Sequence, residues 1–173
     1  MVDACIRCVK ATGWLNFRMR AMVASFSAYH LWLHWREPAV WLGSHFLDFE
    51  PGIHFSQFQM QSGTSGINTV RIYSPAKQAL EQDPEGEFIR HWVPELRDIP
   101  VSWLSNPEQM PAEIQSRYGC IIGRDYPAPI VEHAAAVKEA RERIAVVRRK
   151  METRVEAKKV FVRHGSRKRR PPM

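Results

Sequence analysis

The sequence lacks the features of a membrane or secreted protein. No stretch of apolar residues reaches the roughly 18 residues that a membrane-spanning helix requires. The first residues, MVDACIRCVKATGW, lack the basic and apolar regions of a signal peptide, and only three of the 173 residues are cysteine. These absences predict a soluble, cytoplasmic protein with reduced thiols.

Several short motifs of known enzyme classes are also missing. No Walker loop, G-x-G-x-x-G or G-x-S-x-G occurs, so no motif in the sequence supports nucleotide hydrolysis or serine-hydrolase chemistry. Cys5 and Cys8 form a C-x-x-C, but without a second pair, which favours buried thiols over a zinc or redox site. His30 and His34 are four residues apart beside tryptophans and outside any H-E-x-x-H pattern, so we expect packing and no metal site.

Charge is distributed unevenly along the chain. The composition, 45% apolar and 10% aromatic, predicts a folded protein with a net charge of +7. From Lys138 to the end, 14 Lys and Arg stand against 4 Glu, which gives +10 and leaves −3 for the residues before. Because only the C-terminal part is strongly basic, the net charge is weak evidence that the folded part binds nucleic acid.

Apolar periodicity predicts an all-α protein. Apolar residues recur at three- and four-residue spacing in the segments expected to be helices, residues 2–12, 14–35, 37–49 and 85–96. Residues 62–85 are rich in Ser, Gly, Thr, Asn and Pro, which predicts an irregular crossing. Residues 99–129 hold five of the twelve prolines and predict loops with one short helix.

The C-terminal part predicts one long amphipathic helix and a tail. Apolar residues step by three or four after Pro129, a pattern typical of a docking face, at Val137, Ala140, Ile144, Val147, Met151 and Val155. The tail has too few apolar residues to pack and should be disordered. We therefore divide the chain into a helical domain at 1–130, a long helix at 131–162 and a basic tail at 163–173.

The stretch EPGIHFSQFQMQSG, residues 50–63, has an unusual mixture of side chains. It combines a carboxylate, an imidazole, three glutamines and two phenylalanines. A surface loop would hold fewer aromatics, and a core segment would hold fewer amides. The mixture suits a planar ligand with a polar edge, such as a flavin.

Two arginines interrupt the apolar segment 14–35. A buried guanidinium requires a partner, and the carboxylates nearest to Arg18 and Arg20 in a helical hairpin are Asp48 and Glu50. Two interpretations stay open: a structural ion pair, or a pair that holds a polar ligand between helices.

Several blocks of sequence resemble one known family. They are VDACIRCVKATGWLNFRMRAMVASF, FLDFEPGIHFSQFQMQSGTSGINTVRIYSP, DPEGEFIRHWVPELRDIP and YPAPIVEHAAAVKEARERI. In unbroken order over about residues 2–143, they are similar to the C-terminal half of the FAD-binding helical domain of the photolyase/cryptochrome family. The resemblance implies an all-α fold that supplies one wall of an FAD cavity.

The resemblance also implies which residues meet the cofactor. Arg20 matches the flavin-side arginine of the family, and Asp48 matches its ion-pair partner. Glu50 falls on the second acid of a D-x-D pattern, and Phe17 is also expected at the cofactor. His54 stands beside flavin N5, where photolyases have Asn and plant cryptochromes have Asp.

Other matched positions concern electron transfer and DNA. Trp35 matches the middle tryptophan of the family's three-tryptophan chain and is the candidate electron relay, whereas Phe58 replaces the tryptophan nearest the flavin. Phe17, Ala21 and Met60 replace the Asn, Met and Trp that contact a pyrimidine dimer, and the paired histidines of the other repair class are absent. The DNA-binding positions expected from the resemblance are Arg18, Arg71 and Met60.

Two functional hypotheses follow. The first is an FAD-binding portion of a photolyase- or cryptochrome-like protein, in DNA photorepair or blue-light sensing, that needs an N-terminal companion polypeptide to complete its cavity. Any enzyme activity would be that of a deoxyribodipyrimidine photolyase-like lyase. The alternative is a non-catalytic helical module that binds nucleic acid or a protein partner through its basic tail. No metal is expected in either case.

Overall fold

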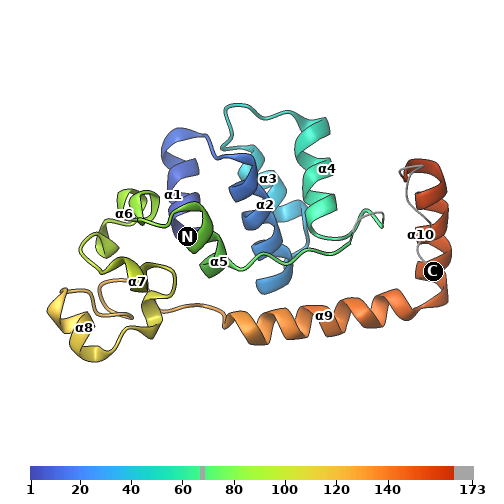
Figure 1. Cartoon of the computed structure of the whole chain (residues 1–173). Coiled ribbons are helices and arrows are strands. Elements are labelled where there is room, and N and C mark those ends of the chain that lie inside the picture. The colour runs from blue at the N-terminus through green and yellow to red at the C-terminus, as the bar shows by residue number, and fades with distance from the viewer. Residues whose placement is uncertain (67–68, 166–173) are drawn as a thin grey trace.

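The computed structural model describes residues 1–66 and 69–165 (Figure 1). The regular secondary structure of this part of the chain is helical, apart from one isolated bridge between Ile122 and Tyr126. The α-helices are α1 (Val2–Thr12), α2 (Phe17–Ser25), α3 (Arg36–Gly43), α4 (Pro51–Gln61), α5 (Pro75–Gln82), α6 (Glu87–Trp92), α7 (Val101–Leu104), α8 (Ala112–Arg117), α9 (His133–Arg149) and α10 (Met151–His164). A π-helix, η1 (Phe26–His30), follows α2, and two 3₁₀ turns, η2 (Pro94–Leu96) and η3 (Pro107–Gln109), follow α6 and α7. The predicted all-α class is confirmed.

Helix starts coincide with capping side chains. The side chain of Asn16 accepts a hydrogen bond from the Met19 backbone N–H, and Ser74 does the same for Lys77. Glu132 accepts hydrogen bonds from two backbone N–H groups at the start of α9. Each cap satisfies a donor that the helix leaves unpaired, and such caps typically contribute about 1 kcal/mol.

Two predicted helices differ in extent from the observed ones, and one segment predicted to be irregular contains a helix. The segment 14–35 starts as a helix only at Phe17, widens into a π-helix at Phe26 and ends at His30; Trp32 then has a positive φ of 53°. The segment 37–49 ends at Gly43, and α5 lies inside the region expected to be irregular.

The predicted single helix over 131–162 is wrong in one respect. It is divided into α9 and α10 at Lys150, whose ψ of 134° is extended, although the sequence there contains neither proline nor glycine. The predicted tail at 163–173 lies largely outside the described residues, because only its first three are described.

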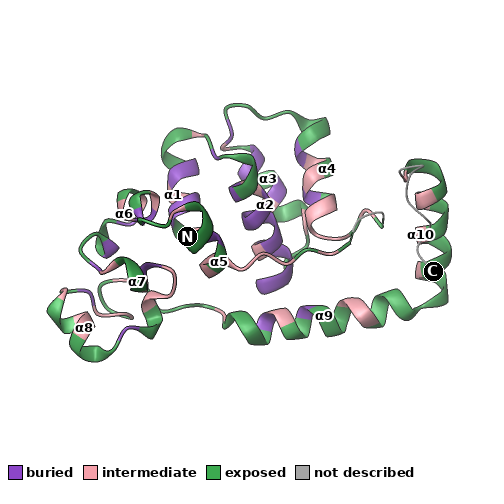
Figure 2. Ribbon diagram, viewed as in Figure 1, coloured by how far each residue is buried: buried purple, intermediate pink, exposed green. Residues whose placement is uncertain are grey.

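Two large apolar clusters form most of the core, and a third, smaller one lies between η1 and α9. The first joins α1, α2, α3 and α4 through Val9, Met22, Leu42 and Phe58, and the second gathers α6 and the turns after it around Ile89 and Leu96. The guanidinium of Arg7 on α1 binds both oxygens of Glu95 in η2, at 2.7 and 2.8 Å, and so connects the two clusters. Figure 2 shows that the buried residues concentrate in α1, α2 and α3.

The cysteines are part of this core, as expected. All three are buried and free, and burial raises the pKa of Cys5 to about 12. No group of three potential metal ligands occurs among the described residues. In the same part of the chain, no helix is long and apolar enough to cross a bilayer.

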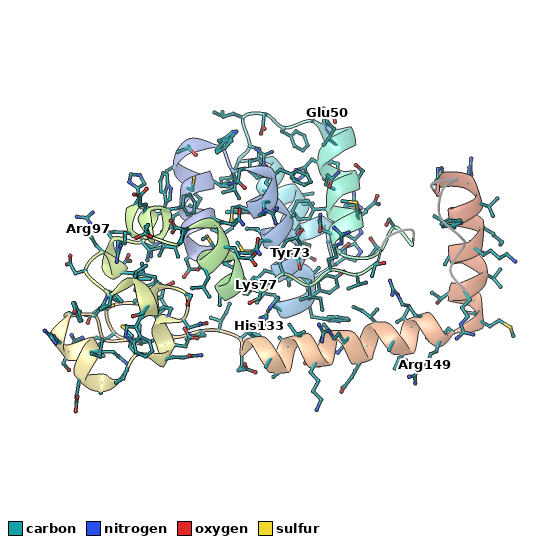
Figure 3. All side chains as sticks on the ribbon, in the orientation of Figure 1. Glu50, Tyr73, Lys77, Arg97, His133 and Arg149 are labelled. Atoms are coloured by element: carbon teal, nitrogen blue, oxygen red, sulfur yellow. The ribbon has the colours of Figure 1, made fainter. Side chains whose placement is uncertain are left out.

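Helix α9 docks through a small contact. Ala140 packs on Ala28 and Tyr29, with Ile144 at the edge. His133, labelled in Figure 3 at the start of α9, places its Nδ1 at 2.8 Å from Nε2 of the buried His30, and the two rings stack. Burial, aided by His133, lowers the pKa of His30 to about 4. His30 therefore serves packing, as predicted, whereas His34 is exposed.

The pKa of His30 predicts an acid-sensitive fold. Because the folded pKa lies below the unfolded value of about 6.5, the native state binds fewer protons, so stability is complete above pH 6.5 and falls as the pH drops toward 4. Between pH 7 and pH 5 we expect His30 to contribute a loss of about 2 kcal/mol. Urea unfolding of the wild type and of His30→Gln measures this. The exposed His91→Gln should keep the wild-type slope, and equal slopes for wild type and His30→Gln would contradict the assignment.

Candidate functional site

A cavity of about 180 Å³ opens between α2, α3 and α4. Its walls are mostly apolar. Its polar side chains belong to α2, to the loop before α4 and to α4 itself. The lining residues are Leu15, Phe17, Arg20, Ala21, Val23, Ala24, Leu42, Phe46, Asp48, Phe49, Glu50, Ile53, His54, Gln57, Phe58 and Gln61. The structure therefore brings together Phe17, Arg20, Asp48, Glu50 and His54, all five residues that the sequence assigned to the cofactor.

Arg20 is held in place by three different interactions. Its Nη2 donates to both oxygens of Asp48 at 3.0 and 2.9 Å, and its Nε donates to the Leu15 carbonyl at 2.6 Å. The guanidinium also lies over the Phe46 ring, 4.0 Å from its centroid. The side chain of Arg20 is 24% exposed and that of Asp48 53% exposed. The expected ion pair exists, but it is open to solvent on the Asp48 side.

A backbone contact brings Asp48 to this position. The Leu47 N–H donates to the Gly13 carbonyl at 3.0 Å, so the loop after α3 lies against the loop after α1. Gly13 has a φ of 68°, and a Cβ atom there would lie 2.6 Å from Cγ of Leu47. Any other residue at position 13 would be strained at this φ and would push against the Leu47 side chain and the His45 carbonyl of the loop that carries Asp48.

Glu50 has a structural task. Its carboxylate accepts the Ile53 backbone N–H at 2.5 Å as the N-terminal cap of α4, where Pro51 occupies the first turn. Among the described residues it forms no ion pair with Arg18 or Arg20, so of the two expected carboxylate partners only Asp48 is used. Glu50 also belongs to the lining of the cavity.

His54 is buried and points one nitrogen at the backbone. Its Nε2 lies 2.7 Å from the Ala39 carbonyl, which only accepts, so Nε2 carries the proton. Burial, ahead of the charge of Arg20, lowers the pKa of His54. The imidazole is therefore neutral at pH 7, with a lone pair on Nδ1. Phe49 and Phe58 surround the ring at 5.2 and 4.9 Å.

Gln57 is the residue whose role the sequence did not single out. Its Oε1 is buried in the cavity wall without a hydrogen-bond partner in the described part of the chain. A buried acceptor without a donor is costly, about 1–3 kcal/mol, unless a ligand supplies one. The three glutamines of residues 50–63 were the signal for it, but spacing alone did not show that Gln57 and Gln61 line the cavity and that Gln57 lacks a partner there.

The donor set and the apolar walls fit the flavin of FAD. A flavin ring needs apolar faces, which the phenylalanines provide, and a polar edge with donors and acceptors. The carbonyl of Gln57, the lone pair of His54 and the guanidinium of Arg20 belong to residues of the cavity lining and offer both kinds of partner.

The remaining predicted residues lie elsewhere. Trp35 is half-buried and does not line the cavity; its ring meets Phe55 edge to face at 6.4 Å. Met60 is half-buried near the end of α4, Arg18 is exposed on α2, and Arg71 is exposed in the segment before α5. The structure does not gather these three candidate DNA contacts at the cavity, and their role stays a prediction.

Comparison with known proteins identifies the domain. Residues 1–146 match the family model described as the FAD binding domain of DNA photolyase. The chain belongs to this family. FAD is accordingly the cofactor of the domain, as the resemblance implied.

Photolyases and cryptochromes are both among the relatives. The chain is 37% identical over 143 residues to the deoxyribodipyrimidine photo-lyase of Escherichia coli, covering 82% of this chain and 28% of that protein. It is 34% identical over 143 residues to cryptochrome DASH of Gloeobacter violaceus, covering 81% and 29%. The chain thus spans less than a third of the length of these relatives.

Solved structures share this fold. A cryptochrome from Synechocystis superposes with a TM-score of 0.78 at 31% identity, covering 81% of this chain and 29% of that one. A class III photolyase from Agrobacterium tumefaciens superposes with a TM-score of 0.79 at 28% identity, covering 86% and 31%. The photolyase-type FAD-binding domain is therefore present here in part.

Replacing Asp48 tests the ion pair at the cavity. Because the pair is partly open to solvent, we expect Asp48→Asn to lower the free energy of unfolding of this chain by about 1 kcal/mol or less. Where FAD is bound, the same change should weaken its binding, since Arg20 loses the partner that orients it. Urea unfolding and flavin titration measure the two effects.

The matched control is Asp98→Asn, which removes an exposed carboxylate outside the cavity. It should change neither quantity. Flavin affinity that is the same in Asp48→Asn and Asp98→Asn would show that Arg20 does not need Asp48.

Proposed function

We propose that this chain forms one wall of the FAD cavity in a light-responsive flavoprotein of the photolyase/cryptochrome family. The observation that carries this proposal is the group formed by Arg20, Asp48, neutral His54 and the unpaired Gln57 carbonyl around one apolar cavity. When bound, FAD supplies the light absorption and the redox chemistry. The residues of this chain orient the ring through Arg20 and His54 and exclude water with their phenylalanines.

The cavity supports the view that the wall is incomplete. Cavities that enclose small molecules typically measure about 300–1,000 Å³, whereas this one measures about 180 Å³. Two apolar residues that line it are largely exposed, Phe17 at 66% and Ile53 at 64%. We propose that a companion photolyase-like polypeptide segment, N-terminal in the relatives, covers these side chains and completes the cofactor site.

The choice between DNA photorepair and light sensing depends on substituted positions. Phe17 and Ala21 line the cavity where the family resemblance expects the Asn and Met that contact a dimer. Neither side chain donates or accepts a hydrogen bond. This supports light sensing, or repair with altered contacts, over unmodified dimer repair. The exposed Arg18 and Arg71 support contacts to a DNA backbone, which carry no sequence information.

The isolated chain should bind FAD weakly. One open wall cannot bury most of the ligand surface, and we expect a dissociation constant above about 1 µM. Equilibrium dialysis of the 173-residue chain against FAD measures it. Adding the N-terminal part of a relative should tighten binding. A submicromolar affinity of the chain alone would contradict the incomplete cavity, and no gain from any added part would contradict the companion.

Phe58→Trp should accelerate light-driven reduction of the bound flavin. Phe58 is buried in the cavity wall, and its benzene ring is much harder to oxidise than an indole, so it interrupts a relay through Trp35. The larger ring carries a packing cost of about 1–3 kcal/mol, so stability must be measured beside the rate. Flavin bleaching under blue light in the reconstituted complex provides the rate.

Phe88→Trp is the control for this experiment, because it adds an indole on α6, outside the cavity lining. It should leave the rate unchanged. Fast reduction in the unmodified complex, or no gain in a stable Phe58→Trp complex, would show that electrons arrive by another route.

A further inference from the structure

A second hollow lies away from the cofactor cavity, on the side of α9. It measures about 240 Å³ and is formed by the segment before α5 and by two turns of α9. Its lining residues are Val70, Ile72, Arg141, Ile144, Ala145 and Arg148. We call this hollow the α9 groove. Figure 1 shows the extended segment before α5 passing above α9.

The α9 groove has an apolar floor. Val70, Ile72 and Ile144 pack against the buried ring of Tyr29, which fixes the floor to the body of the domain. The hydroxyl of Tyr29 is buried without a hydrogen-bond partner among the described residues, and the charge of Arg148 acts on it.

Two cations border this floor. Arg141 and Arg148 are exposed, and neither pairs with a carboxylate in the described part of the chain. They stand seven residues apart, two turns along the same face of α9, which separates their backbones by about 10.5 Å. Residues 141–163 as a whole hold nine Lys and Arg against three Glu. The surroundings therefore attract an acidic partner and repel a second copy of this basic helix.

We propose that the α9 groove binds an acidic amphipathic helix of a partner protein. Two carboxylates seven residues apart on such a helix repeat the 10.5 Å spacing, about the distance between the two arginines. Apolar side chains three and four residues after the first carboxylate lie between them on the same face and meet the floor of Val70, Ile72 and Ile144. Each guanidinium then gains a bidentate partner.

The apolar floor favours a protein over nucleic acid. A phosphate backbone presents charge but no apolar side chains, so it would use the two arginines and leave the floor exposed to water. The lining has no aromatic side chain on which a base could stack. Both features are accounted for by a peptide that carries acidic and apolar residues together.

Fluorescence anisotropy on the full 173-residue chain tests the proposal. The probe is a labelled helical peptide with two glutamates seven residues apart and two leucines between them, and its partner probe has glutamine in place of both glutamates. We expect the acidic probe to bind at least about tenfold more tightly than the glutamine probe. Equal binding of the two probes, or no binding of the acidic one, would overturn the proposal.

Two double variants with equal charge loss locate the site. Arg141→Gln with Arg148→Gln should weaken binding of the acidic probe by about tenfold or more. Arg149→Gln with Lys158→Gln, which removes two cations outside the groove lining, should change it less than about twofold. Equal losses would show general attraction to a basic surface and would overturn the proposal.

A third variant and a second ligand separate protein from nucleic acid. Ile144→Ala trims the floor and should weaken the acidic probe several-fold while leaving the binding of a labelled DNA duplex unchanged. Circular dichroism confirms that each variant keeps its helices. If the duplex binds more tightly than the probe and loses affinity in the Arg141 and Arg148 variant, the groove is a nucleic-acid contact and the proposal fails.

Discussion

The geometry of the cofactor wall depends on the guanidinium of Arg20. A charge that is three-quarters buried needs compensation, and here it receives a carboxylate, a carbonyl and an aromatic face. Because Asp48 belongs to the loop after α3 and Leu15 to the loop after α1, one side chain determines the distance between both loops and α2. The position of α4, whose N-terminal cap follows Asp48 by two residues, is set in turn.

The remainder of the chain is attached to this centre in different ways. The second apolar cluster is joined to α1 by the Arg7–Glu95 pair and by shared contacts of Phe88 and Trp92. Helix α9 is held by Ala140 and Ile144 against Ala28 and Tyr29, and by the two stacked histidines. The cofactor cavity therefore rests on the first and larger apolar cluster, whereas the proposed docking site in the α9 groove rests on this smaller one.

Apolar periodicity predicted the helical class, and several sequence blocks in unbroken order indicated the family. The residues alone offered Asp48 and Glu50 as partners of the arginines, and the family resemblance implied the pairing of Arg20 with Asp48 that the structure shows. The sequence missed the end of the long apolar segment at His30, where no proline or glycine interrupts the pattern and where the residues of the π-turn contact α9, which is distant in the sequence. The break at Lys150 was missed as well, because no proline or glycine stands there either. The role of Gln57 could not be predicted from the sequence, because the direction of its amide depends on the tertiary position of α4. Nor could the sequence show that Glu50 caps this helix.

The π-helix η1 shows how local register connects the two surfaces. An α-helix turns about 100° for each residue, and the wider π-turn absorbs one extra residue without rotating the helix that precedes it. Removing one residue between Phe26 and His30 would therefore restore a regular helix and leave the His30 ring facing His133. The same deletion inside the regular helix α2 would instead rotate every later residue of that helix by about 100° and turn His30 away from α9. The π-turn is thus the place where this helix can lose a residue while α9 keeps its position relative to the flavin-binding wall.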